Sequence, residues 1–115
     1  MNTAPNVVAS SLDALAAQLR QLVNRPSQQA PAQTAALADR VTALGVQMRG
    51  VDFRRGVRLG QVAEALRGRA VARVYLPLPA EELNTLVEML EAAAEIARAA
   101  GRRTVVHHQH GGDAA

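Results

Sequence analysis

The sequence contains no cysteine, no lysine and no tryptophan, and it has only one phenylalanine and one tyrosine. The absence of cysteine excludes disulfides, thiolate metal sites and a thiol nucleophile. The absence of lysine excludes the lysine of a P-loop, a Schiff-base lysine and a lysine general base. Because aromatic side chains are nearly missing, the core must be built from leucine, valine and alanine.

Long apolar runs are missing as well, and we expect no secretory leader in the first residues. The first residues carry no basic region, and Asp13 interrupts the apolar stretch that a signal peptide would need. No run of about 18 apolar residues occurs, so no segment is expected to span a membrane. We therefore expect a cytoplasmic protein that uses no cofactor and has no membrane among its partners.

The length of 115 residues fits one compact domain, or a smaller domain with a helical arm. A core rich in alanine is thin, because alanine buries little area, whereas each buried leucine or valine contributes roughly 1.5 to 3 kcal/mol. Association with another chain would cover more apolar surface. The composition therefore predicts a homo-oligomer, a homodimer or a larger assembly.

The N-terminal half reads as two helices joined by a linker. Leucines recur at helical spacing after Ser10 or Ser11, either of which is a good N-cap residue, and this helix is expected to end near Asn24. A second helix is expected between Thr34, its cap, and Gly50.

The sequence between these helices, residues 25–33, is a linker rich in proline and glutamine. Residues 10–50 are therefore interpreted as a helical hairpin arm. Residues 1–9 and 111–115 show no periodicity, and we expect both to be disordered tails.

The remaining sequence, residues 51–110, reads as a small α+β domain. Its first element is a short helix over Leu59–Arg67, among glycines that break regular structure. Val71–Leu78 alternates and is rich in β-branched residues, which predicts a strand, and Arg103–His108 predicts another. Proline before Ala80–Ala100 and glutamates at its start predict a helix there. The predicted fold class is mainly α with a minor β element (α+β): a helical hairpin followed by a strand-helix-strand unit.

Apolar stripes on the predicted helices are candidate protein interfaces. If they stayed in water, several kcal/mol of burial would be lost, so a second helix or another subunit must cover them. The residues that we expect to form the interface are Leu12, Leu15, Leu19, Leu22, Leu83, Val87 and Leu90.

The segment 49–73 is rich in arginine, with seven arginines against Asp52 and Glu64, a local charge of +5. Clustered guanidinium groups bind nucleic-acid phosphates, an acidic partner, or the glutamates of the long C-terminal helix. The candidate contact residues are Arg49, Arg54, Arg55, Arg58, Arg67, Arg69 and Arg73.

Catalytic and metal-binding patterns are weak. The only histidines, His107, His108 and His110, are close together, but no carboxylate at ligand spacing accompanies them. We expect no metal site and no enzymatic activity, since the aspartates and serines lie in separate segments.

Two functions from different classes are compatible with the sequence. The first is a non-enzymatic assembly or adaptor protein that associates with itself or with another protein through its apolar helix faces. The alternative is a small dimeric regulator that binds nucleic acid through the segment 49–73. Salt separates them, because phosphate binding weakens steeply with ionic strength whereas apolar association does not.

Overall fold

The computed structural model describes residues 4–114, and side chains are described for residues 4–103. Every element in this part of the chain is helical, and it contains no strand. The elements are α1 (Pro5–Val23), a short 3-10 turn η1 (Pro26–Gln28), α2 (Pro31–Arg49), α3 (Phe53–Ala70) and α4 (Ala80–Ala114).

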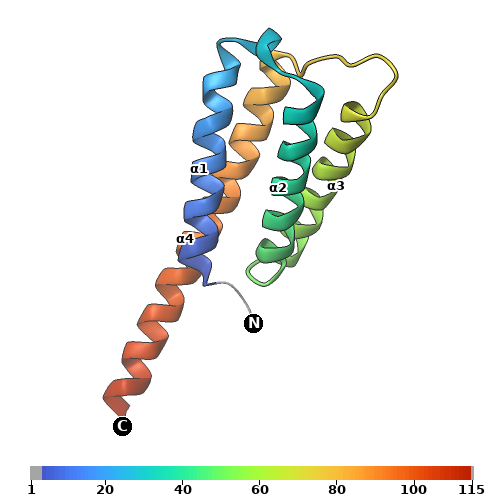
Figure 1. Ribbon diagram of the computed structural model, residues 1–115. Helices are drawn as coiled ribbons and strands as arrows, with labels where there is room; N and C mark the ends of the chain where they lie inside the picture. The colour runs from blue at the N-terminus through green and yellow to red at the C-terminus, as the bar shows by residue number, and fades with distance from the viewer. Residues whose placement is uncertain (1–3, 115) are drawn as a thin grey trace.

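Consecutive helices run in opposite directions and form an up-down-up-down bundle (Figure 1). The closest packing is between α1 and α4 and between α2 and α3. Each helix of the predicted hairpin arm 10–50 therefore has its closest partner within residues 51–110. The segments 24–30 and 71–79, which join one pair to the other, lie at the same end of the bundle.

The prediction of an α+β fold is wrong, because neither predicted strand is present. Val71–Leu78 instead belongs to an irregular connector, residues 71–79, that crosses the end of the bundle between α3 and α4. Its prolines, Pro77 and Pro79, prevent helix formation, and its alternating apolar residues imitate a strand although no strand lies beside it. The backbone of Arg103–His108 continues α4.

The short helix predicted over Leu59–Arg67 is the middle of α3, which runs from Phe53 to Ala70. Asp52 caps this helix, because its carboxylate accepts a hydrogen bond from the backbone N–H of Arg55 at 3.1 Å. The glycines that suggested irregular chain are part of the helix. A Cβ atom at Gly56 would lie 2.6 Å from the carbonyl oxygen of Gly45, so glycine is required there for close approach to α2.

The first two helices begin earlier than predicted, and proline occupies the first helical position in both. Pro5 begins α1, ahead of the predicted caps, so residues 5–9 of the predicted tail are helical. Pro31 begins α2, where the side chain of Gln33 accepts a hydrogen bond from the backbone N–H of Ala30 at 2.9 Å. Proline suits this position because the backbone N–H that it lacks would have no hydrogen-bond partner within the helix.

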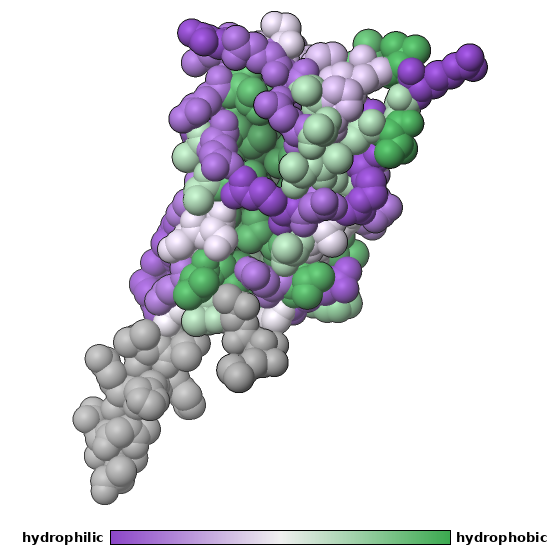
Figure 2. Space-filling view, viewed as in Figure 1, coloured by the Kyte–Doolittle hydropathy of each residue, from purple (hydrophilic) through white to green (hydrophobic). Residues whose placement is uncertain are grey.

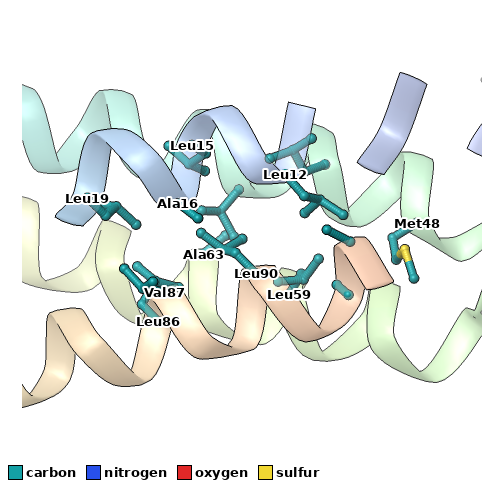
Figure 3. Close-up of a cluster of buried hydrophobic side chains, with 14 of the residues drawn as sticks. Leu12, Leu15, Ala16, Leu19, Met48, Leu59, Ala63, Leu86, Val87 and Leu90 are labelled. Atoms are coloured by element: carbon teal, nitrogen blue, oxygen red, sulfur yellow. The ribbon is translucent and has the colours of Figure 1, made fainter. Parts of the chain in front are cut away.

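The core has two kinds of layer, which follow from residue size. Leucines from facing helices fill the centre, where those of α1 meet Leu59 and Leu90 (Figure 3). Small residues occur seven apart in each helix and let the backbones within each close pair approach. These small buried residues are Ala9 and Ala16 in α1, Ala38 and Gly45 in α2, Gly56 and Ala63 in α3, and Ala94 and Gly101 in α4.

The predicted interface leucines lie inside this core, which corrects their assignment to a surface between subunits. Leu22 is half-buried, and the other six predicted interface residues are at most 2% exposed. The cover comes from the same chain, because α4 packs against α1. In the folded chain these side chains are therefore not accessible to a partner. They are Leu12, Leu15, Leu19, Leu83, Val87 and Leu90.

Candidate functional site: the groove between α3 and α4

The side of the bundle formed by α3 and α4 is hollowed by two adjoining cavities. One, of about 420 Å³, lies near the connector and is lined by Leu66, Leu78 and Leu86 together with polar residues. The other, of about 730 Å³, lies near the turn between α2 and α3. Because both are lined by Val62, Ala65 and Met89, they form one continuous depression, which we call the α3–α4 groove.

One end of the groove is basic. Arg54, Arg55 and Arg58, which we call the groove arginines, project from the first two turns of α3 and line the larger cavity. Within the described residues, none of their side chains makes a hydrogen bond or an ion pair. The neighbouring carboxylate of Asp52 is occupied as the helix cap. Cations in the first turn of a helix are electrostatically unfavourable, so Arg54 and Arg55 occupy positions that the helix alone disfavours.

The other end of the groove is acidic. Glu81 and Glu82 lie in the first turn of α4, where negative charge is favourable, and both line the smaller cavity with Thr85. Glu82 forms an ion pair with Arg69 at 2.9 Å. The carboxylate of Glu81 has no partner among the side chains that the structure describes.

The connector, residues 71–79, is held in place by polar contacts beside this acidic end. The side-chain amide of Gln29 donates to the carbonyl oxygen of Leu78 at 2.8 Å and accepts from its N–H at 3.1 Å. The hydroxyl groups of Thr34 and Tyr75 share a hydrogen bond of 2.6 Å, and Arg69 donates to the carbonyl oxygen of Leu76 at 3.0 Å. These contacts fix the connector while leaving part of it open to solvent.

Exposed large apolar side chains mark both ends of α3. Phe53, at its first residue, is 67% exposed. On the connector, which follows its last turn, Val71 is 78% exposed, Val74 71% and Leu76 63%. In the view of Figure 2, apolar side chains lie at one upper edge of the molecule and also along the middle of the face, between polar side chains. Single exposed apolar residues are ordinary, but a group of three on one short connector is a candidate contact surface.

The arginines predicted to form one basic surface do not all lie together. Arg67 forms ion pairs with Asp39 at 3.1 Å and with Glu64 at 2.9 Å, and Arg69 pairs with Glu82. Arg73 is exposed on the connector, at the opposite end of α3 from the groove arginines. The segment 49–73 is therefore divided between internal ion pairs and two ends of the bundle.

Several arginines outside the groove are also committed to ion pairs. Arg20 pairs with Glu91 at 2.6 Å, and Arg98 pairs with Asp13 and, at 2.6 Å, with Glu95. The hydrogen bond from Arg98 lowers the pKa of the Glu95 carboxyl below its usual range. These pairs tie α1 to α4 and brace α4 itself.

The histidine side chains at positions 107, 108 and 110 lie outside the residues whose side chains are described. Among those that are described, no group of three or more histidine, aspartate and glutamate residues could hold a metal ion. Likewise, no helix in this part of the chain is both long enough and apolar enough to cross a membrane.

Sequence reasoning found the groove arginines but missed the rest of the groove. Its apolar floor, Val62, Ala65 and Met89, is scattered over two helices that are not known to be neighbours until the fold is known. The acidic start of the last helix was visible in the sequence, but only as a helix-start signal. Comparison of the chain with models of protein families, with curated proteins and with solved structures finds no match.

Proposed function

We propose that this protein is a non-enzymatic assembly protein that forms a two-fold symmetric homodimer through the α3–α4 groove. The observation that carries the proposal is the charge order along the groove. The groove has arginines at one end, apolar residues in the middle and glutamates at the other end. When a second copy is turned end over end, its glutamates therefore face the arginines of the first copy.

A two-fold axis that crosses the groove at right angles to the helices turns the second copy end over end. The groove arginines of each copy then lie at the level of Glu81 in the other. The apolar middle of the groove, Val62, Ala65 and Met89, meets the same residues of the second copy. In such an isologous contact both copies use the same residues, so one set of residues forms both sides of the interface.

The exposed apolar residues at the two ends of α3 support the same arrangement. When the second copy is turned end over end, Phe53 of one chain comes to the end of the bundle where the other chain has its connector. The side chains of Val74 and Leu76, which are largely exposed in the single chain, then have an apolar neighbour. Burial of this surface supplies affinity at about 25 cal/mol per Å², and the charges set the orientation.

Charge reversal at each end of the groove tests the proposal. One variant carries Arg55→Glu and Arg58→Glu, which makes both ends of its groove negative. A second variant carries Glu81→Arg and Thr85→Arg, which makes both ends of its groove positive. Like charges then oppose each other in both homodimers, and each variant alone is expected to have the mass of a monomer in light scattering. An equimolar mixture restores opposite charges at both contacts and is expected to recover the mass of a dimer.

The control changes the same charge on the opposite face of the bundle. Arg25 and Arg40 are exposed residues on the α1–α2 side, and neither forms an ion pair among the described residues. The variant Arg25→Glu with Arg40→Glu is expected to remain a dimer. A wild-type protein that is monomeric at all concentrations, or a mixture that stays monomeric, would show that the groove does not join two copies.

A further inference from the structure

The four helices of the bundle pack as two close pairs, α1 with α4 and α2 with α3. Ion pairs reinforce each pair from within. Arg20 of α1 pairs with Glu91 of α4 at 2.6 Å, and Arg67 of α3 pairs with Asp39 of α2 at 3.1 Å. The small buried residues described above also let the backbones approach within each pair. Each pair is therefore held together by its own contacts.

The layer between the two pairs is built from large apolar side chains instead. Leu12, Leu59 and Leu90 meet in it, and each is at most 1% exposed (Figure 3). Depressions in the surface follow both edges of this layer. The α3–α4 groove is on one side, and a cavity of about 250 Å³ between α1 and α2 is on the other.

Polar contacts between the two pairs lie in the middle of the bundle and at the connector end. Arg40 of α2 donates to the side chain of Gln18 of α1, and Arg69 of α3 pairs with Glu82 of α4 at 2.9 Å. The segments 24–30 and 71–79, which join the pairs covalently, also lie at the connector end. Among the side-chain contacts that the structure describes, none joins the pairs at the opposite end, where α2 turns into α3.

We infer that the α2–α3 hairpin, residues 31–70, swings as a rigid unit away from α1 and α4, with the segments 24–30 and 71–79 as its hinge. This motion separates an apolar layer and leaves the ion pairs within each pair intact. Separating α1 from α4, or α2 from α3, would break those ion pairs and the close backbone contacts as well. Locally opening units commonly coincide with motifs such as helical hairpins, and hinges commonly lie in the segments that join them.

The opening bears on the α3–α4 groove, because α3 belongs to the moving hairpin and α4 does not. The two walls of the groove separate when the hairpin swings out, so the groove is complete only in the closed bundle. This consequence for a homodimer rests on the proposed function, whereas the opening itself does not. The test is therefore made at a protein concentration at which light scattering gives the mass of a monomer.

Thiol labelling tests the opening, because the chain has no cysteine of its own. Leu12→Cys places a thiol in the layer between the pairs, and Ala16→Cys places one where α1 packs closely against α4. Leu12→Cys is expected to react on the order of tenfold faster than its own unfolding equilibrium allows. Its labelling should also depend weakly on urea, because opening exposes only one layer. Ala16→Cys is expected to react only through unfolding, with the full urea dependence.

A second pair of variants repeats the comparison from the hairpin side. Leu59→Cys places the thiol in the layer, and Ala38→Cys places it between α2 and α3, where both native side chains are buried. Each labelling rate is compared with the urea unfolding curve of the same variant, so the effect of the substitution on stability cancels. Leu59→Cys is expected to behave like Leu12→Cys, and Ala38→Cys like Ala16→Cys.

Two results would overturn the inference. Labelling of Leu12→Cys and Leu59→Cys that only follows global unfolding would show that the bundle does not open between the pairs. Equal excess labelling of all four variants would show that the helices separate individually and not as two pairs.

Discussion

Gly56 determines how closely α2 and α3 approach, whereas Gly68 in the same helix does not. A Cβ atom at Gly56 would lie 2.6 Å from both the backbone nitrogen of Arg49 and the carbonyl oxygen of Gly45, and neither backbone atom can move easily. Gly68, in the same helix, has no heavy atom within 4 Å of such a Cβ. Sequence reasoning treated these glycines alike, as helix breakers, because local propensity carries no information about the neighbouring helix.

Alanine substitutions separate these two roles. Gly56→Ala is expected to lower the free energy of unfolding by about 1 to 3 kcal/mol, because an overpacked contact outweighs the better helix propensity of alanine. Gly68→Ala is expected to raise it by up to about 1 kcal/mol, since only the propensity changes. Urea unfolding of both variants measures the difference, and equal effects would mean that α2 and α3 do not pack as described.

Local signals predicted the start of α4 correctly, but they did not predict the starts of α1 and α2, and the predicted strands are absent. Pro79 and Glu81 correctly placed the start of α4. The strand prediction for residues 71–78 was wrong because alternation reports only which residue types are present, whereas a strand needs a partner. The connector obtains part of its backbone hydrogen bonding from a side chain instead, since the amide of Gln29 contacts both polar groups of Leu78.

Gln29 is therefore expected to stabilise the connector. Gln29→Ala leaves the N–H and carbonyl of Leu78 without these partners beside a buried side chain, and the expected loss is about 1 to 3 kcal/mol in the free energy of unfolding. The exposed neighbour Gln28 makes no side-chain hydrogen bond among the described residues, so Gln28→Ala is the matched control. Chemical denaturation of both variants measures this, and a Gln29 variant as stable as the control would show that the amide contacts contribute nothing.

The leucine stripe of α1 does not reveal in the sequence which surface covers it, and only the fold of the whole molecule does. The periodicity of Leu12, Leu15 and Leu19 correctly predicts a buried helix face, but the same spacing serves a contact within one chain and a contact between chains. The structure shows the contact within one chain, because α4 covers α1. Among the candidate site residues, the groove arginines could be predicted from the sequence. The groove itself could not, because it exists only once α3 and α4 are placed side by side.

The most direct test of the homodimer is a cross-link at its two-fold axis. Ala65 is an exposed residue that lines both cavities of the groove, so the two copies of it lie close to the proposed axis. Because the chain has no cysteine, Ala65→Cys introduces a single thiol per molecule, and Gln21→Cys places one on the exposed surface of α1 as the control. Under mild oxidation we predict a rapid covalent dimer for Ala65→Cys and little for Gln21→Cys, measured by non-reducing electrophoresis. Equal or absent cross-linking at the two positions would contradict a dimer formed through the α3–α4 groove.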